Sequence, residues 1–375
     1  MDKPRELLEL QIGVSLTKGI TAGYVRRMKE CGMKLEDFFT LDNSSFARAL
    51  GSELRFTIPL SHRQEALFKA RQELKFISSH GISAIFLTDS DYPVRLAECP
   101  DAPVLLYVLG NPHTQSGHVL SVIGTRSMTP YGDAFCCKLI EEAAPQFPDL
   151  VIVSGLAYGA DACAHKAALT AGLPTLGILA HGLNMIYPAP HRDLARRILD
   201  AGGALITEYP FGVKPFKGNF LQRNRIVAGI ADATVVIESD IKGGAMSTAN
   251  TAFSYSRDVL ALPGRVNDRM SSGCNKLIRV HKAQMITCCD DMIEALNWQP
   301  AASSQRAKQR NLFPELENEA KEIFNLLNTN HRDFQLDEIT ALLNIPVATI
   351  LSTLTEMEFD GIVMKLPGNR YTLAL

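Results

Sequence analysis

The sequence predicts an α/β fold: an extended Rossmann-like, doubly wound parallel sheet, with a small helical N-terminal domain and a C-terminal winged helix. Three observations support this prediction. From Ile82 onward, short apolar runs alternate with helical stretches as far as residue 297. Continuous apolar runs are typical of strands buried on both faces, as in a parallel sheet covered by helices. The residues before this region have helical periodicity only, and those after it suggest three helices followed by a hairpin.

The pattern divides the chain into four segments. Residues 1–80 predict short helices with glycine at their ends, which we expect to form a small helical (SAM/helix-hairpin-helix-like) domain. The turn at residues 16–21 is either a DNA-backbone-binding hairpin or part of a purely structural bundle. Residues 81–297 form the Rossmann-like domain, 298–312 a polar linker and 313–375 the winged helix.

Eight apolar runs are the expected strands of the Rossmann-like domain. The runs are rich in β-branched residues and are bounded by glycine, proline or polar residues. They cover residues 82–87, 104–110, 119–123, 150–154, 175–179, 204–207, 234–238 and 258–262.

Composition describes a globular protein of two or three domains. The chain has 375 residues, 46% of them hydrophobic and 21% charged, with a net charge of −2. No run reaches the roughly 18 apolar residues that span a bilayer, and no apolar signal core follows the N-terminus, so we expect a cytoplasmic protein without membrane contact. The eight cysteines form no CxxC pair, which favours buried thiols over a metal site.

The last segment is acidic. Residues 313–375 carry four basic and ten acidic side chains, and the expected recognition helix, residues 347–359, has no lysine or arginine. Duplex binding requires cations against phosphates. We therefore predict that the winged helix contacts protein and does not act as a transcription regulator.

Glycine-rich turns follow three of the expected strands, and we expect them to meet at one edge of the sheet. They are residues 124–132, 154–161 and 242–248, and a fourth segment, residues 220–230, adds two arginines at a helix start. Backbone amides freed by glycine, together with guanidinium groups, bind phosphate. The expected binding residues are Gly124, Thr125, Arg126, Ser154, Gly155, Tyr158, Gly159, Lys217, Phe220, Arg223, Asn224, Arg225, Lys242, Gly243, Gly244 and Thr248.

Several of these residues have a second interpretation. Phe216, Phe220 and Tyr158 can stack on bases or pack in the core, and Asn224 can contact the ligand or support its loop. The arginines of the helix after Pro190 are either ligands of a polyanion or a solvated face; they are Arg192, Arg196 and Arg197.

At this point the chain resembles the DNA-processing protein A (DprA/Smf) family. The resemblance runs in order over about residues 90–285 and rests on Gly124-Thr-Arg, Ser154-Gly-Leu-Ala-x-Gly-Ala-Asp-x-x-Ala-His, Gly182-Leu-Asn-x-x-Tyr-Pro, Thr207-Glu-Tyr-Pro, Arg223-Asn-Arg-Ile-Val-Ala-Gly and Pro263-Gly. It implies a single-stranded DNA-binding protein of natural transformation. Such proteins protect incoming strands, load the RecA recombinase and form homodimers through the Rossmann-like domain. Tyr158 stands where the family often has lysine, which removes one expected phosphate contact.

Enzymatic alternatives rest on a few carboxylates. Asp161 and His165 could form a metal or acid–base pair, but we expect a capping aspartate and a packed histidine. Glu208 and Glu238 could be catalytic, but we expect them to bond loop amides or the nearby arginines. The main alternative function is a nucleotide hydrolase of the lysine-decarboxylase-like (nucleoside monophosphate phosphoribohydrolase) type. Its glycine turn carries a catalytic glutamate that residues 242–250 lack, so we expect no enzyme, no cofactor and no catalytic residue.

Overall fold

The computed structural model describes residues 3–51, 58–113, 116–301, 318–330, 333–359, 362–366 and 370–373. The chain forms two compact units, residues 1–303 and 304–375. Most of the expected linker, from residue 302 onward, lies outside the described residues, as does the Pro-Gly-Asn turn at 367–369.

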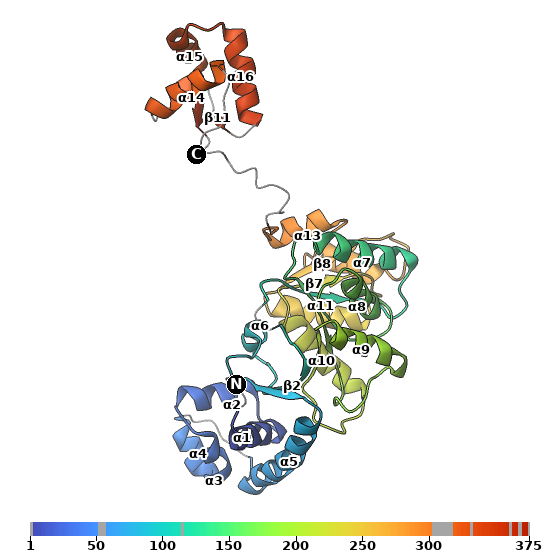
Figure 1. Ribbon diagram of the computed structural model, residues 1–375. Helices are drawn as coiled ribbons and strands as arrows, with labels where there is room; N and C mark the ends of the chain where they lie inside the picture. The colour runs from blue at the N-terminus through green and yellow to red at the C-terminus, as the bar shows by residue number, and fades with distance from the viewer. Residues whose placement is uncertain are drawn as a thin grey trace. The chain divides into compact units, whose positions relative to one another are not determined.

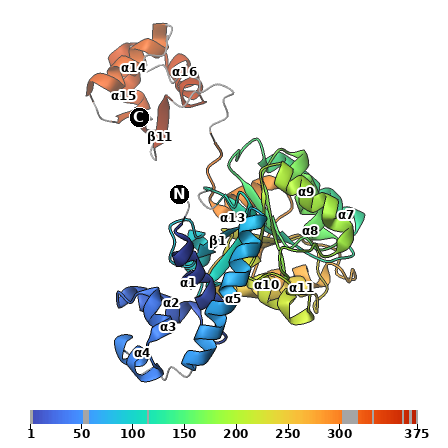
Figure 2. The same ribbon diagram turned by 60° about the horizontal axis from the view of Figure 1, so that its bottom comes forward.

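Within the described residues, five helices form the N-terminal part of the first unit, and Figures 1 and 2 show their arrangement. Asp42 caps the fourth of them by accepting the amide hydrogens of Ser44 and Ser45. Glu73 accepts the amide hydrogen of Phe211 at 2.9 Å, and Arg26 donates to the carbonyl of Cys99 at 2.6 Å, so the helices are attached to the sheet region. Their bounds are α1 Arg5–Leu16, α2 Ala22–Glu30, α3 Leu35–Thr40, α4 Asn43–Ala49 and α5 Leu60–Ser79.

A nine-stranded sheet forms the centre of the described part of this unit, with the strand order β1-β2-β6-β5-β4-β3-β7-β8-β9. The eight expected strands are confirmed, and a two-residue edge strand, β9, joins them. The bounds are β1 Ser83–Phe86, β2 Leu105–Gly110, β3 Val119–Ile123, β4 Val151–Ser154, β5 Thr175–Ile178, β6 Ala204–Thr207, β7 Ala233–Val236, β8 Asp258–Ala261 and β9 Gln284–Met285.

One part of the sheet differs from the sequence prediction. Strands β3 to β9 are parallel, but β1 pairs antiparallel with β2, and β2 antiparallel with β6. A parallel connection needs a crossover helix that lies along the sheet. Between β1 and β2 the described chain has only the single turn α6, Val94–Ala97, so the two strands run antiparallel and extend the parallel sheet.

Helices cover both faces of the sheet. Helices α7, α8 and α13 pack on one face over Leu120, Val122 and Ile152, with α9 beside α8. Helices α10 and α11 pack on the other face with the N-terminal helices. Alternate residues of β3 and β4 therefore enter opposite cores. The bounds are α7 Pro130–Ala143, α8 Ala160–Thr170, α9 Arg192–Asp200, α10 Lys217–Gly229, α11 Gly244–Ser254, α12 Ser272–Arg279 and α13 Cys289–Leu296.

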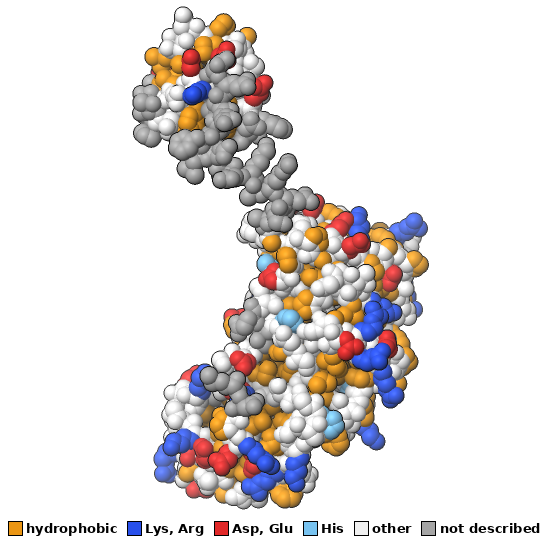
Figure 3. All heavy atoms as spheres, in the orientation of Figure 1, with side chains coloured by type: hydrophobic (Ala, Val, Ile, Leu, Met, Phe, Trp, Pro, Cys, Tyr) orange, Lys and Arg blue, Asp and Glu red, His pale blue; other side chains and the backbone are white. Residues whose placement is uncertain are grey.

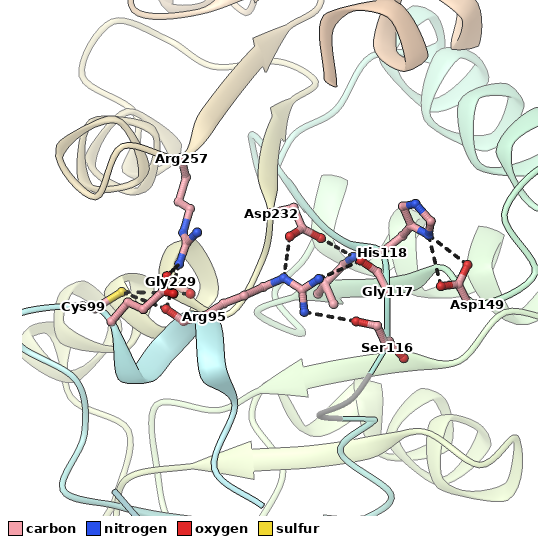
Figure 4. A network of polar contacts seen from close by, with 11 residues as sticks. Arg95, Cys99, Ser116, Gly117, His118, Asp149, Gly229, Asp232 and Arg257 are labelled. Carbon is pink, nitrogen blue, oxygen red and sulfur yellow. Dashed lines mark hydrogen bonds and ion pairs between the residues drawn. The ribbon is translucent and has the colours of Figure 1, made fainter. Parts of the chain in front are cut away.

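The amino ends of β3, β4 and β7 are joined by a polar network (Figure 4). Arg95 pairs with Asp232 at 2.5 Å and also donates to the carbonyl of Gly117 at 2.7 Å. Asp232 accepts the amide hydrogen of Val119 at 2.8 Å. His118 lies 2.9 Å from the Asp149 carboxylate. The charged groups at this edge are thus paired with one another.

The second unit is a winged helix. Its three helices and three-stranded sheet, of order β10-β12-β11, enclose a core that includes Ile323, Ile339 and Leu354. This confirms the expected fold. The bounds are α14 Asn318–Asn330, β10 Phe334–Gln335, α15 Leu336–Leu343, α16 Val347–Phe359, β11 Val363–Leu366 and β12 Arg370–Leu373.

Within the described residues, no single helix has both the length and the apolar composition to cross a bilayer. Only a bent pair, Leu336–Leu343 with Val347–Glu358, meets the length and composition test, across a bend of 116°.

Candidate nucleic-acid interface

A cavity of about 840 Å³ lies at the carboxyl edge of the parallel strands. The three glycine-rich turns follow β3, β4 and β7, which are neighbours in the sheet. The strand order reverses direction at β3, and such a switch point is where open α/β sheets bind ligands. Residues from all three turns and from the start of α10 line the cavity, so the sequence correctly predicted that these segments meet.

Glycine is required where the first two turns touch each other. Gly159 has a φ of +71°, and a Cβ atom there would lie 2.2 Å from the carbonyl oxygen of Thr125. A Cβ on Gly124 would lie 2.6 Å from that of Ala160. The amide of Ala160 donates to the Thr125 carbonyl at 3.1 Å. These two glycines therefore hold the turns together.

The polar groups of the second turn already have protein partners. Asp161 accepts the amide hydrogens of Gly155 at 3.1 Å and Ala157 at 3.2 Å. Burial raises the pKa of Asp161, while the positive charge of Arg223 and these hydrogen bonds oppose the rise. The Ser154 hydroxyl donates to the Val122 carbonyl at 2.6 Å. The expectation that Ser154 and the Gly155 amide hold phosphate is therefore corrected: they shape the turn.

The histidine on the same helix has a structural role. His165 is fully buried, and its Nδ1 lies 2.7 Å from the hydroxyl of Thr175. Burial lowers its pKa to about 3, so the ring is neutral at physiological pH. The packed histidine is confirmed. Asp161 orients the glycine loop as expected, but it does not cap α8, whose N-cap is Gly159 without a side-chain hydrogen bond.

Arg223 forms an inner wall of the cavity. Its side chain is buried, it donates to the carbonyl of Ile178 at 2.6 Å, and a Cβ on Gly155 would lie 1.9 Å from its Nη1. Burial lowers its pKa, but an arginine remains charged in a protein. Arg223 thus supplies a positive potential from inside the wall.

Arg225 does not line the cavity, contrary to the sequence prediction. It pairs with Glu208 at 2.5 Å and donates to the carbonyl of Asp101 at 2.5 Å. Two residues along a helix are separated by about 200°, so Arg223 and Arg225 point to opposite sides of α10. Glu208 was expected to pair with one of these arginines, as it does. Glu238 was expected to bond a loop amide, and it accepts the amide hydrogen of Thr129 at 2.8 Å.

Cations surround the mouth of the cavity. Arg126 and Lys242 are exposed on the first and third turns, and Lys217 is exposed at the start of α10. Arg269, which sequence reasoning missed, pairs with Asp240 at 2.7 Å while its side chain remains 79% exposed. The first amides of α11, which begins at Gly244, have no intrahelical acceptor.

Aromatic side chains stand beside these cations. Phe216 is 69% exposed at the start of α10. Phe220 lies 5.7 Å from Tyr187 and 5.8 Å from the Arg126 guanidinium, measured from its ring centroid. Tyr158 lies outside the cavity lining and packs edge-on against His191 at 4.8 Å. The cavity therefore combines positive charge with aromatic faces.

The structure brings most of the expected site residues together. Ser154, Tyr158, Gly159 and Arg225 are outside the lining. Those that line the cavity are Gly124, Thr125, Arg126, Gly155, Lys217, Phe220, Arg223, Asn224, Lys242, Gly243, Gly244 and Thr248.

The lining residues that were missed as site residues include Tyr187 and Arg269. Tyr187 belongs to the Gly182–Pro188 motif, which could have suggested it; Arg269 lies on a connecting segment with no such signal. The three arginines of α9 lie on its exposed face, and Arg196 pairs with Asp193. In the view of Figure 3, lysine and arginine side chains gather along the margin over α8 and α9.

The fold places the chain in the Rossmann-like class, and a switch-point cavity lined by cations, aromatic rings and glycine turns is typical of members of that class that bind phosphate groups. Residues 83–297 match the family model of DNA recombination-mediator protein A, and residues 307–369 match that of the DprA winged helix domain. The chain belongs to the DNA recombination-mediator protein A (DprA/Smf) family.

Curated relatives support this assignment. Protein Smf of Escherichia coli is 33% identical over 74% of this chain and 74% of its own length. The putative DNA processing protein DprA of Mycobacterium tuberculosis is 37% identical, and the match covers 60% of each chain.

Two solved structures are also similar. DNA processing protein A from Streptococcus pneumoniae has a TM-score of 0.62 at 29% identity, over 78% of this chain and 98% of that one. DNA processing protein A from Helicobacter pylori, whose structure concerns its single-stranded DNA binding mode, has a TM-score of 0.52 at 31% identity, over 59% of this chain and 97% of that one.

Proposed function

We propose that this chain binds single-stranded DNA in the carboxyl-edge cavity without turning it over. The observation that carries the proposal is the side-by-side placement of exposed cations and exposed aromatic rings at one cavity. Single strands are bound by positive grooves that follow the phosphates and by aromatic faces on which bases stack. The relative from Helicobacter pylori is described by its single-stranded DNA binding mode.

Each component has a distinct task in this proposal. Arg126, Lys217 and Lys242 contact phosphates at the mouth, and buried Arg223 adds potential from the wall. Phe216 and Phe220 present faces for bases. Because stacking and phosphate contacts do not read base edges, binding has little sequence preference.

The carboxylates of the cavity argue against a hydrolase. Asp161 is occupied by two amides of the second turn, and Asp240 pairs with Arg269. Asn250 stands where the hydrolase pattern has glutamate; it donates to the Met246 carbonyl at 2.7 Å and accepts from Lys282 at 2.7 Å. The cavity thus offers a polyanion site with no evident general base.

We infer the biological setting from the family. The chain protects incoming single strands during natural transformation, loads the RecA recombinase onto them and acts as a cytoplasmic homodimer through its Rossmann-like domain. A dimer presents two cavities to one strand, which raises avidity through effective concentration. The acidic winged helix, whose helix α16 lacks lysine and arginine, binds protein.

The test is fluorescence anisotropy of labelled oligo-dT, its duplex and a nucleoside monophosphate over a range of salt concentrations. The variant Arg126→Ala/Lys242→Ala should bind the single strand at least about 100-fold more weakly, since each of the two lost hydrogen bonds to a charged group contributes about 1.5–3 kcal/mol. Its log–log salt slope should fall by about 1.4, from two phosphate contacts.

The control is Arg196→Ala, an exposed arginine of α9 outside the cavity, which should bind like the wild type. Equal loss in both variants would indicate non-specific charge attraction. Weak DNA binding together with saturable binding and turnover of the mononucleotide would establish the hydrolase instead.

A further inference from the structure

The helix pair α7 and α8 carries a cluster of thiols and a carboxylate that the cavity does not use. Cys137 and Cys163 have their sulfur atoms 3.7 Å apart. These two sulfurs and a carboxylate oxygen of Asp133 all lie within 4.8 Å of one another. The two helices pack side by side, as both ribbon views show (Figures 1 and 2).

The spacing along the chain explains the cluster. Asp133 and Cys137 are four residues apart on α7, so they lie on one face, one turn above the other. Cys163 lies in the first turn of α8 and faces them, with its sulfur 3.9 Å from the carbonyl oxygen of Asp133. Two ligands at i and i+4 on one helix with a third from its neighbour converge on one point.

We propose that Asp133, Cys137 and Cys163 form a binding site for a thiolate-preferring cation of the Zn²⁺ type. A tetrahedral zinc ion with Zn–S bonds of about 2.3 Å separates two bound sulfurs by roughly 3.8 Å. The two sulfurs, 3.7 Å apart, are therefore almost at the separation that a zinc ion requires. Sulfur ligands select zinc over magnesium or calcium, and the carboxylate supplies a third ligand.

Exposure and charge also suit a cation. Cys137 and Asp133 are exposed and Cys163 is buried, so an ion can enter from solvent and water can complete the tetrahedron. The acidic groups near Cys137 include Asp133 and Glu141. Cys136 is buried beside Cys163 in the core, and it is outside the group whose ligand atoms all lie within 4.8 Å of one another.

The position of the site gives it a structural role. Helix α7 starts directly after the first glycine-rich turn, and α8 starts directly after the second. Asp133 and Cys163 belong to the first turns of these helices. A bound ion would therefore link α7 to α8 next to the two glycine-rich turns that line the carboxyl-edge cavity. This link would stabilise the contact between the two turns.

The experiment uses Co²⁺ as a spectroscopic probe on the reduced, full-length chain after chelator treatment. We expect one equivalent to bind, with a thiolate-to-cobalt charge-transfer band and the visible bands of tetrahedral cobalt, and Zn²⁺ to displace it. Zn²⁺ should also raise the midpoint of thermal unfolding. Absence of the thiolate band would overturn the proposal.

Variants localise the site. Cys137→Ser, at an exposed position, should abolish the charge-transfer band and the thermal shift, and Asp133→Asn should weaken Co²⁺ binding at least ten-fold. Cys31→Ser, another exposed cysteine, should leave the spectrum unchanged. A band that survives in Cys137→Ser would overturn the proposal. So would a count of six titratable thiols in the unreduced, denatured chain that rises to eight with reductant and is seven in unreduced Cys137→Ser, because the pair would then be a disulfide.

Discussion

The amino and carboxyl edges of the sheet differ in whether their cationic side chains are paired with carboxylates. At the amino edge, Arg95 and Asp232 pair with each other, and His118 lies against Asp149. At the carboxyl edge, no carboxylate within the described part of the chain pairs with Arg126, Lys217 or Lys242, and all three border a cavity. A charge that finds a partner in its own chain stabilises the fold, whereas one held open at a cavity is available to a ligand.

Helix α10 repeats this contrast within one turn. Arg223 is buried and forms part of the cavity wall. Arg225, on the opposite side of the helix, forms an ion pair with Glu208. Asn224, which stands between the two arginines in the sequence, also lines the cavity. Residue type alone therefore does not separate a binding arginine from a structural one.

The largest effect is expected where the two turns of the carboxyl edge touch. Gly159→Ala should lower the free energy of unfolding by about 3 kcal/mol, combining a strained φ with overpacking against the Thr125 carbonyl. Gly172→Ala is the control, since Gly172 also has a positive φ, +72°, but no neighbour within 4 Å. It should cost about 1 kcal/mol. Equal losses in urea unfolding would show that the turn contact contributes nothing.

A change at the amino edge should affect stability and spare binding. Arg95→Ala leaves the Asp232 carboxylate and two carbonyls without their donor, and we expect a loss of about 2–3 kcal/mol in urea unfolding. Oligo-dT affinity should stay within two-fold of the wild type. The exposed pair of Arg196 and Asp193 is the control, and Arg196→Ala should cost less than about 0.5 kcal/mol. A large affinity loss in Arg95→Ala would contradict the division between the edges.

A change at an aromatic ring of the cavity should give the reverse pattern, with weaker binding and unchanged stability. Phe216→Ala should weaken oligo-dT binding by about 1–3 kcal/mol, the usual contribution of one stacked base, with no loss of stability because the ring is 69% exposed. Phe68→Ala, which removes a 60% exposed ring from α5, is the matched control. Anisotropy and urea unfolding of both variants decide the matter: unchanged affinity in Phe216→Ala would remove it from the site.

The buried histidine of α8 predicts a pH dependence of stability. Burial lowers the pKa of His165 to about 3, whereas an unfolded histidine titrates near 6.5. The unfolded chain therefore binds one more proton between these values, and stability is lost as pH falls from about 6.5 toward 3. This group should contribute a slope of about 1.4 kcal/mol per pH unit. His165→Gln should lack that contribution in urea unfolding at pH 4.5 and 5.5, and an unchanged slope would contradict the assignment.

The smallest effect is expected from the second unit. A chain that ends at residue 303 should bind oligo-dT within a few-fold of the full-length protein, because the acidic winged helix supplies few cations for phosphate. Anisotropy at several salt concentrations measures this. A loss of ten-fold or more would place part of the DNA-binding surface in residues 304–375.

Much of the site was visible in the sequence because it is local. A buried strand followed by glycine turns such as residues 124–132 places polar groups at a sheet edge in any parallel fold. Side-chain direction is not local. Arg225 and Ser154 have suitable chemistry, but Glu208 and Val122, which are distant from them in sequence, already bind these groups.

The sequence by itself determined the strands, the winged helix and the family, since apolar periodicity and ordered glycine motifs depend only on neighbours along the chain. The tertiary structure alone decided that β1 and β2 run antiparallel, that Arg269 joins the cavity, and that Cys137 meets Cys163. These outcomes depend on how separate elements pack. Whether a polar group is available to a ligand is a property of its surroundings, and a chain creates those surroundings only when it folds.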